Sequence, residues 1–166
     1  CVMSGATFAD TWTVDDDGKA DFENIQAAVD AASDGDEIVV MPGTYTSMQD
    51  GHVVNMLGKA VTLRSSDPSD PDVVAATIID GENTRRGLAC FNQETSKTII
   101  SGFTITNGYG VVFEYDSGGE ITGGGMYCRY SNPTLNHCTF KDNVSDAYGG
   151  GIYSFGAQLS LTNCKF

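Results

Sequence analysis

The sequence has few basic residues and no long hydrophobic run. It contains 9 Lys and Arg against 22 Asp and Glu, which gives a formal net charge of −13. A surface with this charge repels phosphate backbones, so we exclude nucleic acid as a partner. The longest apolar stretches, such as residues 38–41, are much shorter than the roughly 20 residues that span a bilayer. The sequence therefore predicts no transmembrane helix.

The closely spaced cysteine pairs of zinc and redox motifs are also missing. The chain has five cysteines, and none of them forms a C-x-x-C motif: Cys1, Cys90, Cys128, Cys138 and Cys164. Glycine, in contrast, is abundant at 20 of 166 residues, and charged residues make up only 19%. This composition is typical of a turn-rich β protein, and the length suits one domain.

One segment has the pattern of an amphipathic helix. Its apolar residues recur at helical spacing: Phe22, Ile25, Ala28, Val29 and Ala32. With Asp21 as the N-cap and Gly35 after the last turn, the pattern predicts a helix over 21–33. A β-branched run at 37–41 predicts the first strand, and no second helical pattern follows.

Two motifs repeat with the same period. Residues 123–128 (GGGMYC) recur at 149–154 (GGGIYS), and residues 135–140 recur at 161–166, each with a shift of 26. Units of this size bury their apolar side only by stacking, so equivalent residues should lie on adjacent coils. The predicted columns place Tyr127 over Tyr153 on the outside and three sets inside: Leu88, Met126, Ile152; Phe103, Cys138, Cys164; Ile105, Phe140, Phe166.

The sequence resembles a known family of folds. Residues 22–45, with FENIQAAVDAA, GDEIVV and PGTY, resemble the N-terminal cap and first coil of right-handed parallel β-helix proteins of the pectin-lyase-like superfamily. Residues 140–143 (FKDN) and 149–152 (GGGI) resemble the F-x-x-N and G-G-x-I repeats of polymorphic outer membrane proteins and related bacterial surface proteins.

This resemblance implies an all-β, right-handed parallel β-helix, or β-solenoid, with one N-terminal capping helix. Residues 1–20 would form an N-terminal arm, 21–45 the cap helix and first coil, and 46–166 further coils that are open at the C-terminal end. The resemblance also implies a secreted or cell-surface location. It does not imply a reaction, because the superfamily mixes enzymes with adhesins and structural proteins.

Three functions remain open. The sequence lacks the catalytic set of polygalacturonase-like members, which consists of Asn-Thr-Asp, Asp-Asp, Gly-His-Gly and Arg-x-Lys. We therefore predict no catalytic residue and favour a structural or adhesive module. One alternative is a polysaccharide lyase or hydrolase, or a fragment of one, with Arg129 as a lyase base instead of a solvated arginine. The other is a passive carbohydrate-binding module that stacks a glycan on Tyr127 and Tyr153.

Candidate ligand and cross-linking residues complete the prediction. Asp15, Asp17 and Asp21 form either a calcium site or a hydrated turn with an N-cap, and we expect no other cofactor. Cys90 aligns with Cys128, and Cys138 with Cys164, so each pair forms either a disulfide or a ladder of free thiols.

The C-terminal coil predicts an interaction surface. Leu159, Leu161, Cys164 and Phe166 repeat inward positions without a closing segment, so further coils or another subunit should cover them. We expect end-to-end association into a filament or surface assembly, with the arm at 1–12 involved and Cys1 forming an intersubunit disulfide. Cys1 also resembles the first residue of a mature bacterial lipoprotein, whose lipid would be the chain's membrane contact.

Overall fold

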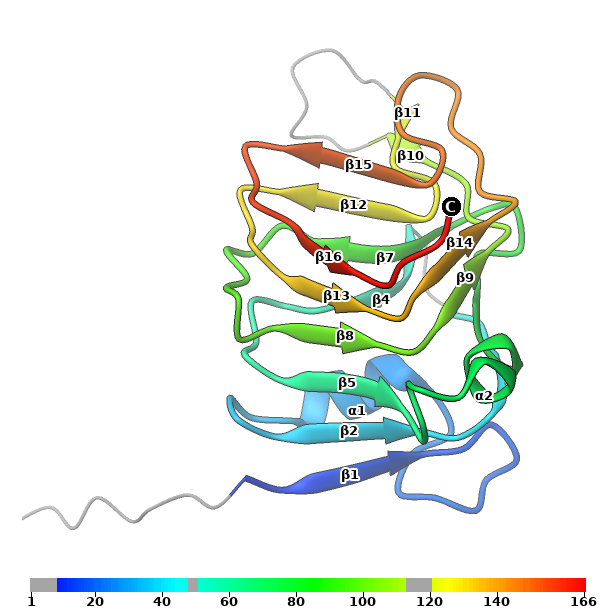
Figure 1. Cartoon of the computed structure of the whole chain (residues 1–166), viewed down its shortest axis with the longest axis vertical. Helices are drawn as coiled ribbons and strands as arrows, with labels where there is room; N and C mark the ends of the chain where they lie inside the picture. Colours follow the sequence, from blue (N-terminus) through cyan, green and yellow to red (C-terminus); the bar gives the residue numbers. More distant parts are fainter. Residues whose placement is uncertain (1–8, 48–50, 113–120) are drawn as a thin grey trace, which may run out of the picture.

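The fold consists of three parallel β-sheets stacked along one axis (Figure 1). The computed structural model describes residues 9–47, 51–112 and 121–166; Cys1 lies outside them. Sheet A contains β1 (Thr11–Val14), β2 (Glu37–Val40), β5 (Thr62–Ser65), β8 (Ile99–Ser101), β13 (Thr134–Asn136) and β16 (Ser160–Thr162). Sheet B contains β3 (Gly43–Tyr45), β6 (Thr77–Asp80), β9 (Thr104–Thr106) and β14 (Thr139–Lys141). Sheet C contains β4 (His52–Asn55), β7 (Arg86–Cys90), β12 (Met126–Arg129) and β15 (Ile152–Phe155).

The chain visits the three sheets in a fixed order. It passes from β2 to β3 and β4, then from β5 to β6 and β7, and each circuit places its strands beside those of the circuit before. Before β12 the third circuit carries a short antiparallel pair, β10 (Val111–Val112) and β11 (Ile121–Thr122). The all-β class is confirmed, and the arrangement is consistent with a parallel β-helix.

The first helix is shorter than predicted. α1 spans Ile25–Ala31, and its N-cap is Asn24, whose side chain accepts a hydrogen bond from Ala27 N at 2.8 Å. The prediction of Asp21 as the N-cap is wrong, because that carboxylate accepts hydrogen bonds from the backbone and hydroxyl of Thr13 instead. As expected, α1 buries Ile25 and Val29 against the first coils.

A second helix was not predicted. α2 spans Pro71–Ala76, begins at the N-cap Asp70 and packs beside sheet B, where Thr104 Oγ1 donates to the Val74 carbonyl at 2.9 Å. Its six residues bury one side chain, Val74, so no helical repeat of apolar residues is visible in the sequence. The detectable signal is Asp70 followed by proline, a capping residue before a favourable first helical position.

The predicted register of the coils is confirmed. Met126 pairs with Leu88 on one side and with Ile152 on the other. In sheet A the interior column is Ile38, Leu63, Ile100, Leu135 and Leu161. The first four members are 0% exposed, so the core is a continuous stack of apolar side chains along the sheets.

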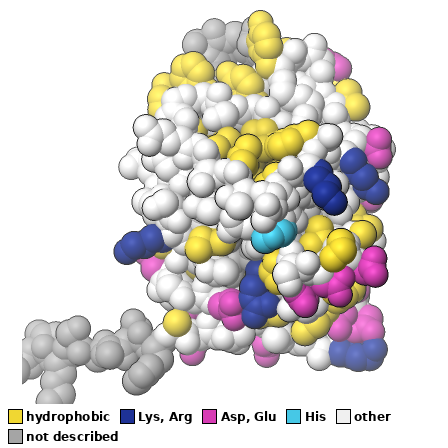
Figure 2. All heavy atoms as spheres, viewed as in Figure 1, with side chains coloured by type: hydrophobic (Ala, Val, Ile, Leu, Met, Phe, Trp, Pro, Cys, Tyr) yellow, Lys and Arg dark blue, Asp and Glu magenta, His cyan; other side chains and the backbone are white. Residues whose placement is uncertain are grey.

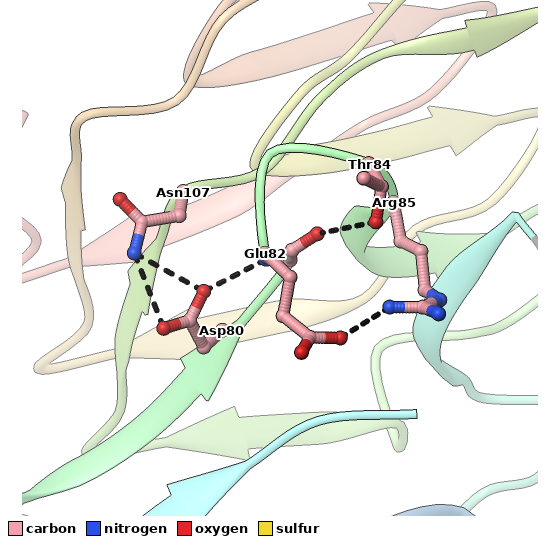
Figure 3. A network of polar contacts seen from close by, with 6 residues as sticks. Asp80, Glu82, Thr84, Arg85 and Asn107 are labelled. Carbon is pink, nitrogen blue, oxygen red and sulfur yellow. Dashed lines mark hydrogen bonds and ion pairs between the residues drawn. The ribbon is translucent and has the colours of Figure 1, made fainter. Parts of the chain in front are cut away.

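The corners between sheets use left-handed backbone conformations and polar side chains. At the corner after β6, Asp80 accepts from Asn107 Nδ2 of the next circuit at 3.1 Å and from Glu82 N at 2.8 Å (Figure 3). Glu82 has a φ of 54° and also pairs with Arg85. These hydrogen bonds satisfy polar groups of the turn and tie it to the neighbouring circuit.

Candidate functional site

The cysteines lie in two pairs across neighbouring coils, as predicted. Cys128 is in register with Cys90, and the bridge between Thr139 and Lys165 places Cys164 beside Cys138. All four thiols are free, so the thiol ladder is the arrangement observed. Burial is the main cause that raises the pKa of Cys90, and it raises that of Cys128 to about 12. Neither of these two thiols is ready to react as a thiolate.

The tyrosine column exists, but its first ring is not exposed. Tyr127 and Tyr153 stack with ring centroids 5.6 Å apart. Tyr127 is only 1% exposed, because the Arg86 guanidinium lies 4.7 Å from its ring centroid and Phe91 packs against its edge. The prediction that Tyr127 is an outward platform for a sugar ring is therefore wrong. Tyr153 is half-buried.

A buried arginine holds this region together. Arg86 is 0% exposed and donates hydrogen bonds to the carbonyls of Gly123, at 2.7 Å, and Thr122, at 2.5 Å. Its charge lies near His52, whose pKa is lowered first by burial and then by Arg86. The sequence gives no sign of this role, because Thr122 and Gly123 are more than 30 residues away along the chain.

The three candidate calcium ligands do not converge. Asp17 pairs with Lys19, while Asp15 accepts from the backbone N–H of Asp17 at 3.3 Å. Asp21 is engaged with Thr13, and the Thr13 hydroxyl is the main cause of its lowered pKa. Within residues 9–47, 51–112 and 121–166 no group of three or more His, Cys, Asp or Glu is arranged to hold a metal ion. Calcium binding stays a prediction, and in the structure these aspartates take part in hydrogen bonds and an ion pair within the turn.

A groove that the sequence did not predict runs between α2 and the outward side of sheet B. It has a volume of about 400 Å³. We call it the α2 groove, and its main lining residues are Pro68, Pro71, Val74, His137, Lys141 and Lys165. The helix supplies the apolar wall, and the last two circuits supply the basic one. Four separate segments build it, so it could not be predicted from any one of them.

The α2 groove is basic in a strongly acidic protein. Its described lining residues include two lysines and a histidine but no carboxylate. Neither Lys141 nor Lys165 belongs to any of the three ion pairs found among the described residues. His137 adopts a left-handed turn conformation, with a φ of 52°, and its Nε2 lies 2.9 Å from the Asn163 amide nitrogen. His137 is half-buried in this turn.

Comparison with known proteins gives no assignment. No family model matches the chain, and no curated protein matches it. Among the described residues, no helix is long and apolar enough to cross a membrane.

The C-terminal edge exposes large apolar side chains. β14, β15 and β16 each end their sheet, and Leu161 and Phe166 are 43% and 73% exposed. Phe166 continues the column of Phe140, whose ring stacks on it with centroids 5.4 Å apart. A hollow of about 350 Å³ lies beside them, lined in part by Ile152. The expected apolar edge is thus present.

Proposed function

We propose that the chain is a non-catalytic β-helix of the pectin-lyase-like kind, secreted or displayed at a cell surface. It acts as a structural and adhesive module and binds a second copy of itself at the C-terminal edge. The observation that carries the proposal is the exposure of Leu161, the next member of an interior column whose first four members are fully buried. A second apolar surface would remove it from water.

The two ends of the stack differ in a way that favours one mode of association. On β1, Thr13 N donates to Asp21 Oδ2 and Phe22 N donates to the Thr13 carbonyl, so this edge is already occupied. α1 also covers the first coils. A head-to-tail filament needs a bare edge at both ends, whereas two C-terminal edges can meet across a two-fold axis. A closed dimer is therefore favoured over a filament.

Charge supports the same contact. On the face shown in Figure 2, most acidic side chains lie over the first circuits, and the upper part over the last circuits carries mainly uncharged groups. Two copies that meet through their last circuits keep their acidic regions apart. This arrangement lowers the repulsion that a net charge of −13 imposes on any association.

The test is sedimentation of the 166-residue chain over a range of micromolar concentrations. We expect a species of twice the 17.6 kDa chain mass. Leu161→Lys should restore the monomer, because it places a charge in the contact. Leu57→Lys is the matched control, since Leu57 is 39% exposed but lies in the first circuit. A monomer at every concentration would overturn the association.

The non-catalytic assignment has its own assay. The protein should release neither unsaturated products nor new reducing ends from acidic polysaccharides, with or without calcium. Cleavage that disappears in Arg129→Ala would contradict the assignment, because Arg129 is the one residue we considered as a lyase base. Its guanidinium lies 5.1 Å from the ring centroid of Tyr130.

A second candidate function, binding of an anionic glycan, is favoured by the α2 groove. Lys141 and Lys165 offer unpaired ammonium groups, and the apolar wall from α2 suits the face of a sugar ring. Oligogalacturonate should bind, neutral dextran should not, and Lys141→Ala with Lys165→Ala should abolish binding. Lys97→Ala, an exposed lysine elsewhere, is the control. If the Lys141→Ala/Lys165→Ala double variant and the Lys97→Ala control bind oligogalacturonate equally well, the α2 groove is not the binding site.

A further inference from the structure

Two cysteine pairs occupy equivalent places between coils, but their surroundings differ. Cys90 and Cys128 are both 0% exposed. Cys138 is also 0% exposed, whereas Cys164 is half-buried on the last circuit. A reagent in solution can therefore reach one thiol of the second pair and neither thiol of the first.

The second pair also lies in register between the last two circuits. The parallel bridge between Thr139 and Lys165 sets Cys138 opposite Cys164. Lys165 N donates to the Cys138 carbonyl at 2.9 Å, which holds the two segments in a parallel register. Neighbouring strands in such a ladder lie about 4.8 Å apart. This spacing falls within the Cα separation of disulfides, about 4.4 to 6.8 Å.

The electrostatic setting separates the two pairs further. The adjacent Cys138 thiol is the main cause that lowers the pKa of Cys164, and the nearby His137 adds to it. At Cys90 and Cys128 burial raises the pKa, and the buried carboxylate of Glu94 raises it further. Among the four described cysteines, only Cys164 combines access with a stabilised thiolate, the two requirements for a reactive cysteine.

We propose that Cys138 and Cys164 are a redox-active dithiol that closes to a disulfide between the last two circuits, while Cys90 and Cys128 stay reduced. The oxidant is a small-molecule disulfide such as glutathione disulfide. The Cys164 thiolate attacks one of its sulfurs, forms a mixed disulfide and releases a glutathione thiolate. Cys138 then attacks Cys164 Sγ and releases the second glutathione. The protein loses two protons and two electrons, and the oxidant becomes two glutathione thiols.

The bond would tether the end of the stack. β16 pairs with β13 on one side only, and its residues are exposed. A disulfide from Cys164 to Cys138 closes a loop of about 26 residues, which restricts the unfolded last circuit and keeps β16 in register. Both cysteines belong to one chain, so the inference does not depend on the proposed dimer.

The experiment is differential alkylation after equilibration with glutathione disulfide, in a Cys1→Ser background that removes the cysteine outside the described residues. We expect a mass loss of about 2 Da and one cross-linked peptide that contains Cys138 and Cys164. In the reduced protein, iodoacetamide should modify Cys164 at least about tenfold faster than Cys90.

Matched variants give the controls. Cys164→Ser and Cys138→Ser should each abolish the 2 Da loss, while Cys90→Ser should leave it unchanged. Cys138→Ser should instead accumulate the mixed disulfide on Cys164, because the resolving thiol is missing. Full alkylation of both cysteines in excess glutathione disulfide would overturn the proposal. A cross-link between Cys90 and Cys128, or a stable mixed disulfide in the parent protein, would overturn it as well.

Discussion

At the scale of single residues, the most unusual feature is a fully buried arginine, Arg86. The Arg86 guanidinium satisfies two backbone carbonyls and lies against the ring of Tyr127. A buried charge is tolerated only when hydrogen bonds replace its hydration. Arg86 therefore stabilises the approach of Thr122 and Gly123 to β7, and it influences His52 through its charge.

Replacing Arg86 should change both the free energy of unfolding and the pKa of His52. We expect Arg86→Met to lower the free energy of unfolding by at least about 2 kcal/mol, because two buried carbonyls lose their donors. The pKa of His52 should rise, since one cause of its depression is removed, but burial should keep it below the usual value. NMR titration can follow it because the chain has only two histidines. Arg86→Lys keeps the charge and should leave the pKa lowered; a rise in both variants would contradict the charge effect.

A second residue ties the N-terminal strand to the first turn. Asp36 is 4% exposed and accepts hydrogen bonds from Asp10 N and Ser33 N, both at 2.8 Å, and from Trp12 Nε1 at 3.2 Å. The backbone N–H of Ser33 is the main cause that lowers its pKa. The ionised carboxylate is thus the form that the fold needs.

This site predicts a pH dependence with a definite sign. The pKa of Asp36 is lower in the folded state than its value of about 3.9 in the unfolded chain. The contribution of Asp36 to the free energy of unfolding is therefore complete above the unfolded-state pKa. It is lost as the pH falls through the folded-state pKa. Asp36→Asn should destabilise the protein at pH 7 by about 1–3 kcal/mol. The difference between parent and variant should shrink between about pH 5 and pH 2 in urea unfolding. A constant difference would rule out ionisation as the cause.

At the scale of elements, α1 closes the first coils. Its buried residues pack against β1, β2 and β4, where the interior of the stack would otherwise meet water. Ile25→Asp places a charge in this contact and should unfold the protein or reduce the free energy of unfolding by at least about 3 kcal/mol. Ala31→Asp adds the same charge at an exposed position and should cost about 1 kcal/mol or less. Equal melting temperatures would show that α1 is dispensable.

The elements also show which parts of the fold the sequence could predict. The interior columns were predictable because a 26-residue repeat fixes which residues are neighbours, as with Met126 and Ile152. α2 was not, because a six-residue helix with one buried side chain has no measurable period. The burial of Tyr127 was missed for a different reason, because Arg86 and Phe91, which pack against it, come from an earlier circuit. Alternation predicts which way a side chain points but not what covers it.

The candidate sites, too, were predictable only where they lie within repeated motifs. The cysteine pairs and the apolar edge were predictable, because both lie within repeated motifs. The α2 groove was not, since Lys141 and Lys165 meet α2 only after the circuits have stacked. The unequal reactivity of the two cysteine pairs also depends on distant groups, among them Glu94 beside Cys90.

At the scale of the whole molecule, the net negative charge opposes folding. The net charge is −13, and the described residues contain three ion pairs, in which every side chain is at least 22% exposed. Exposed pairs of this kind contribute little. Repulsion between the remaining carboxylates therefore opposes the compact state, and added salt should screen it.

The melting temperature should consequently rise when NaCl is increased from about 10 to 150 mM, since the Debye length falls from about 30 to 8 Å. A gain of about 1 kcal/mol corresponds to about 2–4 °C for a chain of this size. Lys97→Glu, which makes the net charge more negative at an exposed position, should steepen the rise, and Glu23→Gln should flatten it. Calorimetry is done at a concentration where sedimentation shows a single species, so that association does not add to the effect. A melting temperature that falls with salt in all three proteins would mean that attractive pairs outweigh the repulsion.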